Sequence, residues 1–291
     1  MLGRSFSELR RHYGFYLAIF VIALIFNVLI WWIASIFGLG EGLGNVIMMM
    51  TYYGRGLTDV PREEMLYMMT DVLQGMNLSY FVISQLVVFL LSTLVTILMN
   101  RSLLQKVNYP ETQIADSAYF NTPLGDCLIL PLKLFFAQIV VGILYAVILF
   151  AASLLVGTAS QSFGSFTWVV AVIVSLLFMA MAVFVLPIQY FIAYDVERRY
   201  NFWATITKSM AIGRDHFLRI LKTLLVQMAL MVIYFGFFSV TAIYGFESSR
   251  DALTMVWIMF LIAMAGFIFF LLPLMNIYLI KTMNQVISLE Y

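Results

Sequence analysis

The residues best suited to chemistry in this chain are basic, and six of its 16 lysines and arginines gather between residues 187 and 222. They are Arg198, Arg199, Lys208, Arg214, Arg219 and Lys222. Apolar residues alternate with them, mostly three or four apart, which is the spacing of one helix face. These apolar residues are Phe202, Trp203, Ile206, Met210, Phe217 and Leu221. A basic amphipathic segment between two long apolar runs is typical of a helix on a membrane surface.

Two interpretations of this basic segment remain open. In the first, the charges only set the topology of the chain in the membrane. In the second, a helix predicted over residues 201–212 docks lipid headgroups or a cytoplasmic partner such as an ATPase, because each such charge attracts anionic lipid by about 1 kcal/mol. The docking residues would be Arg198, Arg199, Phe202, Trp203, Lys208, Arg214, Arg219 and Lys222.

Residues suited to catalysis or to metal binding are scarce. The only histidines, His12 and His216, stand in charged segments, and the single cysteine, Cys127, can form no internal disulfide. Glu63 and Glu64 are neighbours on a predicted helix, so their carboxylates point to different sides of it. We therefore predict no catalytic residues, no cofactor and no metal site, and we expect that the protein is not an enzyme.

A methionine-rich segment is a further candidate for binding. Seven of the 19 methionines fall between residues 48 and 76. Thioether sulfur suits Cu(I), but no histidine or cysteine lies nearby, so flexible apolar packing at the membrane surface is the favoured interpretation. A glycine-rich run over 38–44 follows no predicted strand and is interpreted as a loop, and a short surface helix is predicted over 59–75.

The elements that must position these residues are long apolar runs. Hydrophobic residues make up 63% of the chain and charged residues 11%, which is too apolar for a soluble domain. A membrane span needs about 20 apolar residues. We predict an all-α membrane protein, a single polytopic domain over 1–291, with six transmembrane helices and short interfacial amphipathic helices. The predicted spans cover residues 15–37, 78–99, 131–156, 168–193, 217–243 and 252–280.

The distribution of lysine and arginine predicts the orientation of these spans. With six spans, 13 basic residues fall on the side of both termini and three fall on the other side. The positive-inside rule then places the N and C termini in the cytoplasm. Lys133, near the start of the third span, is expected to extend toward the headgroups. Gly213 is expected to end the surface helix and Asp215 to cap the fifth span.

The strongest polar groups inside the predicted spans are amides, and the span centres hold no ionisable group. These amides are Asn27, Gln85, Gln138, Gln189, Gln227 and Asn276, and the candidates for a polar path or for helix packing are Gln85, Gln189, Gln227 and Asn276. Such groups usually form hydrogen bonds between helices, and a path for a polar substrate is the alternative. Pro187 and Pro273 stand near the inner ends of the fourth and sixth spans and predict a kink in each.

The stretch LPIQYFIAYDVERRYNFWATITKSMAIGRDHFLRIL resembles the later half of the YciC-type bacterial membrane proteins and the related membrane domain beside some glycerophosphodiester phosphodiesterases. The shared features are a proline near the end of a span, a charged turn, a surface helix with a Lys208-Ser209 pair, and a basic start to the next span. The resemblance covers about residues 130–240. It implies a six-span protein of the bacterial inner membrane, and it carries over no catalytic residues because the phosphodiesterase domain is absent from this sequence.

These observations favour a non-catalytic membrane subunit or scaffold of an envelope or transport complex, with membrane lipids and a cytoplasmic or membrane protein as partners and no nucleic acid. The alternative is the permease subunit of an ABC-type exporter that pairs with a separate ATPase. In that case the loops predicted over 100–126 and 195–222 would act as coupling elements. A membrane lipid enzyme is a third hypothesis, for which the sequence shows no chemistry.

Overall fold

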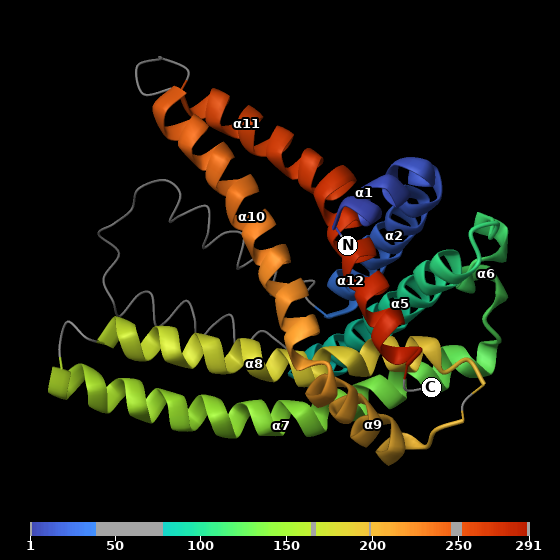
Figure 1. Cartoon of the computed structure of the whole chain (residues 1–291), viewed down its shortest axis with the longest axis horizontal. Helices are drawn as coiled ribbons and strands as arrows, with labels where there is room; N and C mark the ends of the chain where they lie inside the picture. The colour runs from blue at the N-terminus through green and yellow to red at the C-terminus, as the bar shows by residue number, and fades with distance from the viewer. Residues whose placement is uncertain (1, 39–77, 164–166, 198, 246–251, 290–291) are drawn as a thin grey trace. The chain divides into compact units, whose positions relative to one another are not determined.

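The computed structural model describes residues 2–38, 78–163, 167–197, 199–245 and 252–289 (Figure 1). Within these ranges the chain forms helices and short connections and no strand. The elements are α1 (Leu2–Arg11), α2 (Tyr13–Gly38), α5 (Leu78–Asn108), the 3-10 turn η1 (Ile114–Asp116), α6 (Ala118–Asn121), α7 (Leu124–Phe163), α8 (Thr167–Tyr194), α9 (Phe202–Asp215), α10 (Phe217–Gly245), α11 (Ala252–Gly266), the π-helical segment η3 (Phe267–Leu271) and α12 (Leu272–Ile287). The methionine-rich segment, the helix predicted over 59–75 and Arg198 lie outside the described residues.

Five helices are long and apolar enough to cross a membrane: Tyr13–Ala34, Val82–Asn108, Leu124–Ala152, Phe217–Thr241 and Val256–Ile287. The shortest has 22 residues, which at about 1.5 Å per residue exceeds a hydrocarbon core of roughly 30 Å. The all-helical prediction is therefore confirmed, and the five helices indicate a multi-pass membrane protein. In α8, a shorter apolar stretch runs over Ala180–Tyr194. The sixth span and the side of the termini stay predictions.

The helix that begins at Leu78 continues nine residues beyond the predicted end of the second span, to Asn108. No glycine or proline interrupts the sequence between Leu78 and Pro110, and the helix ends just before Tyr109, whose helical conformation is disfavoured by the following proline. Arg101 and Lys106 are therefore helical residues. Their assignment to a loop over 100–126 was wrong.

The chain divides into two compact units, Met1–Val21 with Ile97–Tyr291, called here the larger unit, and Ile22–Thr96, called the smaller unit. The helices α2 and α5 each run from one unit into the other, so the single domain over 1–291 stays a prediction. In the smaller unit, α2 and α5 line an apolar pocket of about 280 Å³ that includes Ile30, Ile83 and Leu91. Gln85 belongs to this unit and is half-buried.

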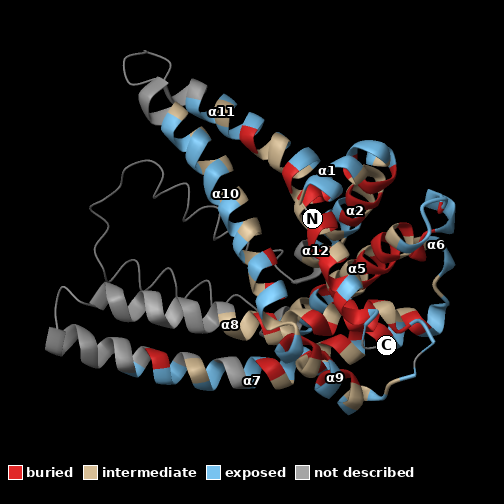
Figure 2. Ribbon diagram, viewed as in Figure 1, coloured by how far each residue is buried: buried red, intermediate tan, exposed pale blue. Residues whose placement is uncertain are grey.

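The core of the larger unit centres on the end of α8 and on α12, which appear red in the burial view (Figure 2). Four consecutive residues of α8, Tyr190 to Ala193, are all buried, so this turn is enclosed on every side. By contrast, α10 carries exposed apolar side chains such as Val232 and Phe237 along its length. An apolar and exposed helix is the pattern expected of a surface that faces lipid.

Three prolines lie within helical runs, and at two of them, Pro187 and Pro273, another part of the chain contacts the backbone carbonyl four residues earlier. Pro273 has no N–H to offer the carbonyl of Phe269, and the Tyr13 hydroxyl donates to that carbonyl at 2.9 Å. Pro187 has the same relation to the carbonyl of Val183, against which α9 packs through Gly213. Neighbouring groups thus cover the backbone positions that the prolines leave without an intrahelical donor.

Candidate functional site

The surface helix α9 begins at a sequence-encoded cap and rests on α8. Asn201 is the N-cap, and its side-chain oxygen accepts a hydrogen bond from the Ala204 amide at 2.8 Å, as short polar residues do at helix starts. The buried residues of α9 repeat at helical spacing: Thr205, Ile206, Ser209, Ile212 and Gly213. Three of them, Thr205, Ser209 and Gly213, are small and four apart, a spacing that lets two helices approach closely.

Gly213 explains why α9 does not end where the sequence predicted. An added Cβ at this position would lie 2.8 Å from the Phe184 Cα and 2.9 Å from the Val183 carbonyl oxygen. Glycine is therefore required here for close approach to α8, and α9 continues to Asp215 with His216 as its C-cap. Asp215 does not cap the fifth span, because α10 begins at Phe217. Both boundary predictions were wrong.

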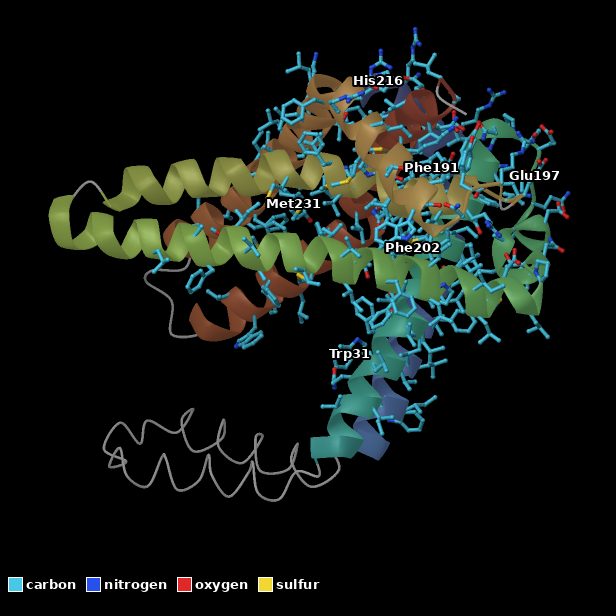
Figure 3. All side chains as sticks on the ribbon, turned by 90° about the horizontal axis from the view of Figure 1, so that it is seen from below. Trp31, Phe191, Glu197, Phe202, His216 and Met231 are labelled. Atoms are coloured by element: carbon cyan, nitrogen blue, oxygen red, sulfur yellow. The ribbon has the colours of Figure 1, made fainter. Side chains whose placement is uncertain are left out.

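The opposite side of α9 and the first turns of α10 present basic residues. Lys208, Arg214, Arg219 and Lys222 are all exposed, and Trp203 is 63% exposed. These five residues are called the basic surface below. Figure 3 shows nitrogen- and oxygen-tipped side chains around His216, which lies between α9 and α10. Whether these exposed residues dock lipid or a partner stays a prediction.

Within the basic surface, Lys208 and Arg214 each form a hydrogen bond with another side chain. The Lys208 ammonium donates to the Tyr200 hydroxyl at 3.0 Å and lies 4.3 Å from the centre of that ring. The Arg214 Nε donates to Asp215 at 2.8 Å. The hydrogen bond and charge of Arg214 hold the pKa of the Asp215 carboxyl below its ordinary value.

Two further predicted docking residues contribute differently. Arg199 is exposed but forms a salt bridge with Glu197, with 2.5 Å between the Nη2 and Oε2 atoms. Phe202 packs against the core of the larger unit, so it anchors the start of α9 instead of projecting toward a partner.

A buried ion pair joins the turn before α9 to α7. The Lys133 Nζ lies 3.8 Å from an Asp195 carboxylate oxygen and donates to the Tyr200 carbonyl at 2.9 Å. Asp195 also accepts from the backbone amides of Arg199 and Tyr200 at 2.9 and 3.3 Å. The lysine was expected to extend toward the headgroups, but its side chain is only 15% exposed. A buried carboxylate therefore holds the ammonium, and its position relative to the headgroups stays a prediction.

A second buried ion pair connects three helices. The Arg101 Nη1 of α5 lies 3.6 Å from the Asp126 carboxylate of α7, and its Nε donates to the Ala193 carbonyl of α8 at 3.3 Å. These residues border a pocket of about 500 Å³ that also includes Gln105 and Tyr194. Sequence reasoning missed this group. The sequence without glycine or proline from Leu78 to Asn108 was the signal that could have placed Arg101 on a helix.

The four amides singled out in the sequence, Gln85, Gln189, Gln227 and Asn276, lie in different surroundings and do not form one group. The Gln227 Nε2 donates to the Met275 carbonyl at 2.7 Å and so links α10 to α12, while the Asn276 Nδ2 donates to the Leu272 carbonyl at 2.9 Å within its own helix. Gln189 instead borders a pocket of about 180 Å³ between α7 and α8. Gln85 belongs to the smaller unit. Of these amides, Gln227 makes the contact between helices that the helix-packing interpretation predicts.

Groups that could support catalysis do not converge in the part of the chain that the structure describes. His12 lies 3.9 Å from Glu8 on the first helical turns, whereas His216 stands between α9 and α10. Among the described residues, no three histidine, cysteine or acidic side chains form a group that could hold a metal ion. The arrangement can bind charged groups on a rigidly held surface helix.

Comparison of the chain with protein-family models, with curated proteins and with solved structures gives no match.

Proposed function

We propose that this protein is a non-catalytic, multi-pass protein of the bacterial inner membrane and serves as a membrane subunit or scaffold. Its basic surface would dock a cytoplasmic protein partner. The observation that carries the proposal is how α9 packs. Small residues hold one side of the helix against α8, and the other side exposes lysine, arginine and tryptophan. Because the helix position is determined by close backbone contact, little conformational freedom is lost when a partner binds.

The charge of the surface defines the partner that would fit it. Arg219 and Lys222 lie three residues apart on the first turns of α10, and both are exposed. Tryptophan and arginine are the residues that most often dominate binding energy at protein interfaces. We therefore expect an acidic patch on the partner, with Trp203 supplying the apolar contact.

Two observations from the sequence and one from the structure support a membrane protein with this surface on the cytoplasmic side. The excess of basic residues on the side of both termini fits the positive-inside rule. The resemblance to YciC-type proteins implies the bacterial inner membrane. Five apolar helices fit a multi-pass membrane protein.

Co-purification tests the docking surface. We would isolate the tagged full chain from its native membranes in mild detergent and compare the wild type with the double variant Arg219→Glu/Lys222→Glu. The matched control is Arg10→Glu/Arg11→Glu, which reverses two exposed charges on α1. A stoichiometric partner that is lost at least tenfold from the first variant only is the expected result. Loss from both variants, or from neither, contradicts the proposal, and a nucleotide-binding partner would identify the exporter alternative.

The side of the membrane is tested separately. Thr207 is exposed on α9, so a Thr207→Cys substitution in a Cys127→Ser background offers one accessible thiol. A membrane-impermeant thiol reagent should label inverted membrane vesicles and leave intact cells unlabelled. Labelling of intact cells would place α9 outside and refute a cytoplasmic partner.

A further inference from the structure

The long helix α7 carries a glutamine amide in the middle of its candidate membrane span. That span covers Leu124–Ala152, and Gln138 lies halfway between its ends. The Gln138 side chain is exposed. Hydrocarbon offers an amide no hydrogen bond, so a polar group at this depth is costly unless another protein group faces it. The position of Gln138 therefore indicates a contact between membrane helices.

The neighbouring helix α8 covers a different side of α7 (Figure 1). The residues of α7 that are buried recur at helical spacing, and they are Leu134, Ala137 and Val141. All three border the small pocket between α7 and α8. Gln138 also borders this pocket, but it forms no hydrogen bond with any residue that the structure describes. Its amide is thus available to a group from outside the chain.

Two small residues continue the side of α7 that carries Gln138. Gly142 and Ala146 follow it at intervals of four residues, and both are exposed. A Cβ added to Gly142 would meet nothing within 4 Å. The fold of one chain therefore does not require glycine here, although glycine weakens a helix relative to alanine. Small residues four apart let the backbones of two membrane helices approach closely.

A second copy of this chain matches this side of α7. Copies in one membrane have the same orientation, so their Gln138 amides always lie at the same depth. A two-fold axis along the membrane normal brings the same side of α7 against itself. Glutamine has two N–H donors and a carbonyl acceptor, so it is complementary to a second glutamine.

We propose that the chain forms a homodimer through α7, with Gln138 of one copy hydrogen-bonded to Gln138 of the other. An N–H of each amide donates to the carbonyl oxygen of the opposite amide, which satisfies both polar groups inside hydrocarbon. The two helices cross where Gly142 and Ala146 allow close approach. None of these residues belongs to the basic surface, so the dimer does not depend on the proposed docking function.

Energy transfer in phosphatidylcholine vesicles tests the association of full chains that carry a donor or an acceptor fluorescent protein at the C terminus. Gln138→Leu should lower the association constant about 3- to 30-fold, and Gly142→Ile should lower it at least tenfold. Gly236→Ile is the matched control, because Gly236 also lies within an exposed helix and an added Cβ there meets nothing within 4 Å. This control should associate as the wild type does. Unchanged association of Gln138→Leu, or equal loss in both isoleucine variants, would overturn the proposal.

Cysteine cross-linking in native membranes identifies the occupant, and it keeps the test decisive if Gly142→Ile does not fold, as judged by circular dichroism. In a Cys127→Ser background, copper-phenanthroline oxidation of Ala146→Cys should give a disulfide-linked dimer of two differently tagged copies. Val147→Cys is the matched control, because Val147 is 63% exposed but points to another side of α7. Its yield should be at least tenfold lower, and adding Gln138→Leu to Ala146→Cys should lower the yield at least threefold. Equal yields at the two positions, or cross-linking of Ala146→Cys to a different protein, would refute the homodimer.

Discussion

Replacing Gly213 with alanine adds a methyl group where α9 meets the backbone of α8. The added Cβ would lie 2.8 Å from the Phe184 Cα and 2.9 Å from the Val183 carbonyl oxygen. Carbon atoms in optimal contact are about 3.5–4.0 Å apart. Because both obstructing atoms belong to the backbone, no side-chain rotation can relieve the overlap. The two helices must therefore separate by about 0.7 Å.

The expected cost follows from two opposing effects. Overpacking of a close contact costs about 1–3 kcal/mol, and alanine gains about 1 kcal/mol over glycine in a helix interior. Gly236 provides the matched control, because it also lies inside a helix, α10, and an added Cβ there meets nothing within 4 Å. The Gly236→Ala variant should therefore show the helix gain alone. The difference between the two variants isolates the overlap at about 1–3 kcal/mol, or 5- to 150-fold in the folded-to-unfolded ratio.

Denaturant unfolding of the two variants in detergent, followed by far-UV circular dichroism, measures this difference in the free energy of unfolding. Gly213→Ala should also weaken co-purification of a partner, because the displaced helix carries Trp203 and Lys208. Equal unfolding free energies for the two alanine variants would refute the close contact between α9 and α8. Weakened co-purification of the partner without a lower free energy of unfolding would likewise contradict the contact, because the predicted loss of binding follows from the loss of packing.

Two further predictions concern contacts inside the larger unit. An added Cβ at Gly266 overlaps the Tyr234 hydroxyl oxygen. Gly266→Ala should therefore lower the free energy of unfolding by at least about 0.5 kcal/mol less in a Tyr234→Phe background than in the wild type. Additive changes in this double-mutant cycle would contradict the geometry. Arg101→Met leaves Asp126 buried without its cationic partner and should destabilise the protein by about 3–5 kcal/mol, whereas Arg101→Met combined with Asp126→Leu should recover most of that loss in the same unfolding measurement. A double variant as unstable as the single one would show that the ion pair is not the cause.

The extents of several helices followed closely from the apolar runs. α2 and α10 match their predicted spans within two residues at each end, because a membrane-spanning helix must be apolar for most of its length. α5 was predicted too short because charge was taken as the end of the helix. Arg101 shows why this rule failed: a charged side chain can remain helical when a carboxylate from another helix faces it.

The candidate site was predictable in composition but not in arrangement. Exposure of Lys208, Arg219 and Lys222 follows from their charge. The packed side of α9 was predictable only in part: Ile206 is buried as the apolar spacing indicates, but Thr205, Ser209 and Gly213 are small and carry little hydrophobic signal. Trp203 was assigned to the apolar face of the predicted helix, but the side of α9 that packs against α8 leaves it exposed.

The sequence alone determined that this chain is helical, that it is apolar enough for a membrane, and that its basic residues gather around one amphipathic segment. These properties depend on composition and on spacings of a few residues. Only the tertiary structure paired Arg101 with Asp126 and Lys133 with Asp195, and only it placed α9 against α8 at Gly213. Such contacts join residues far apart in the chain, and their formation depends on how the helices pack.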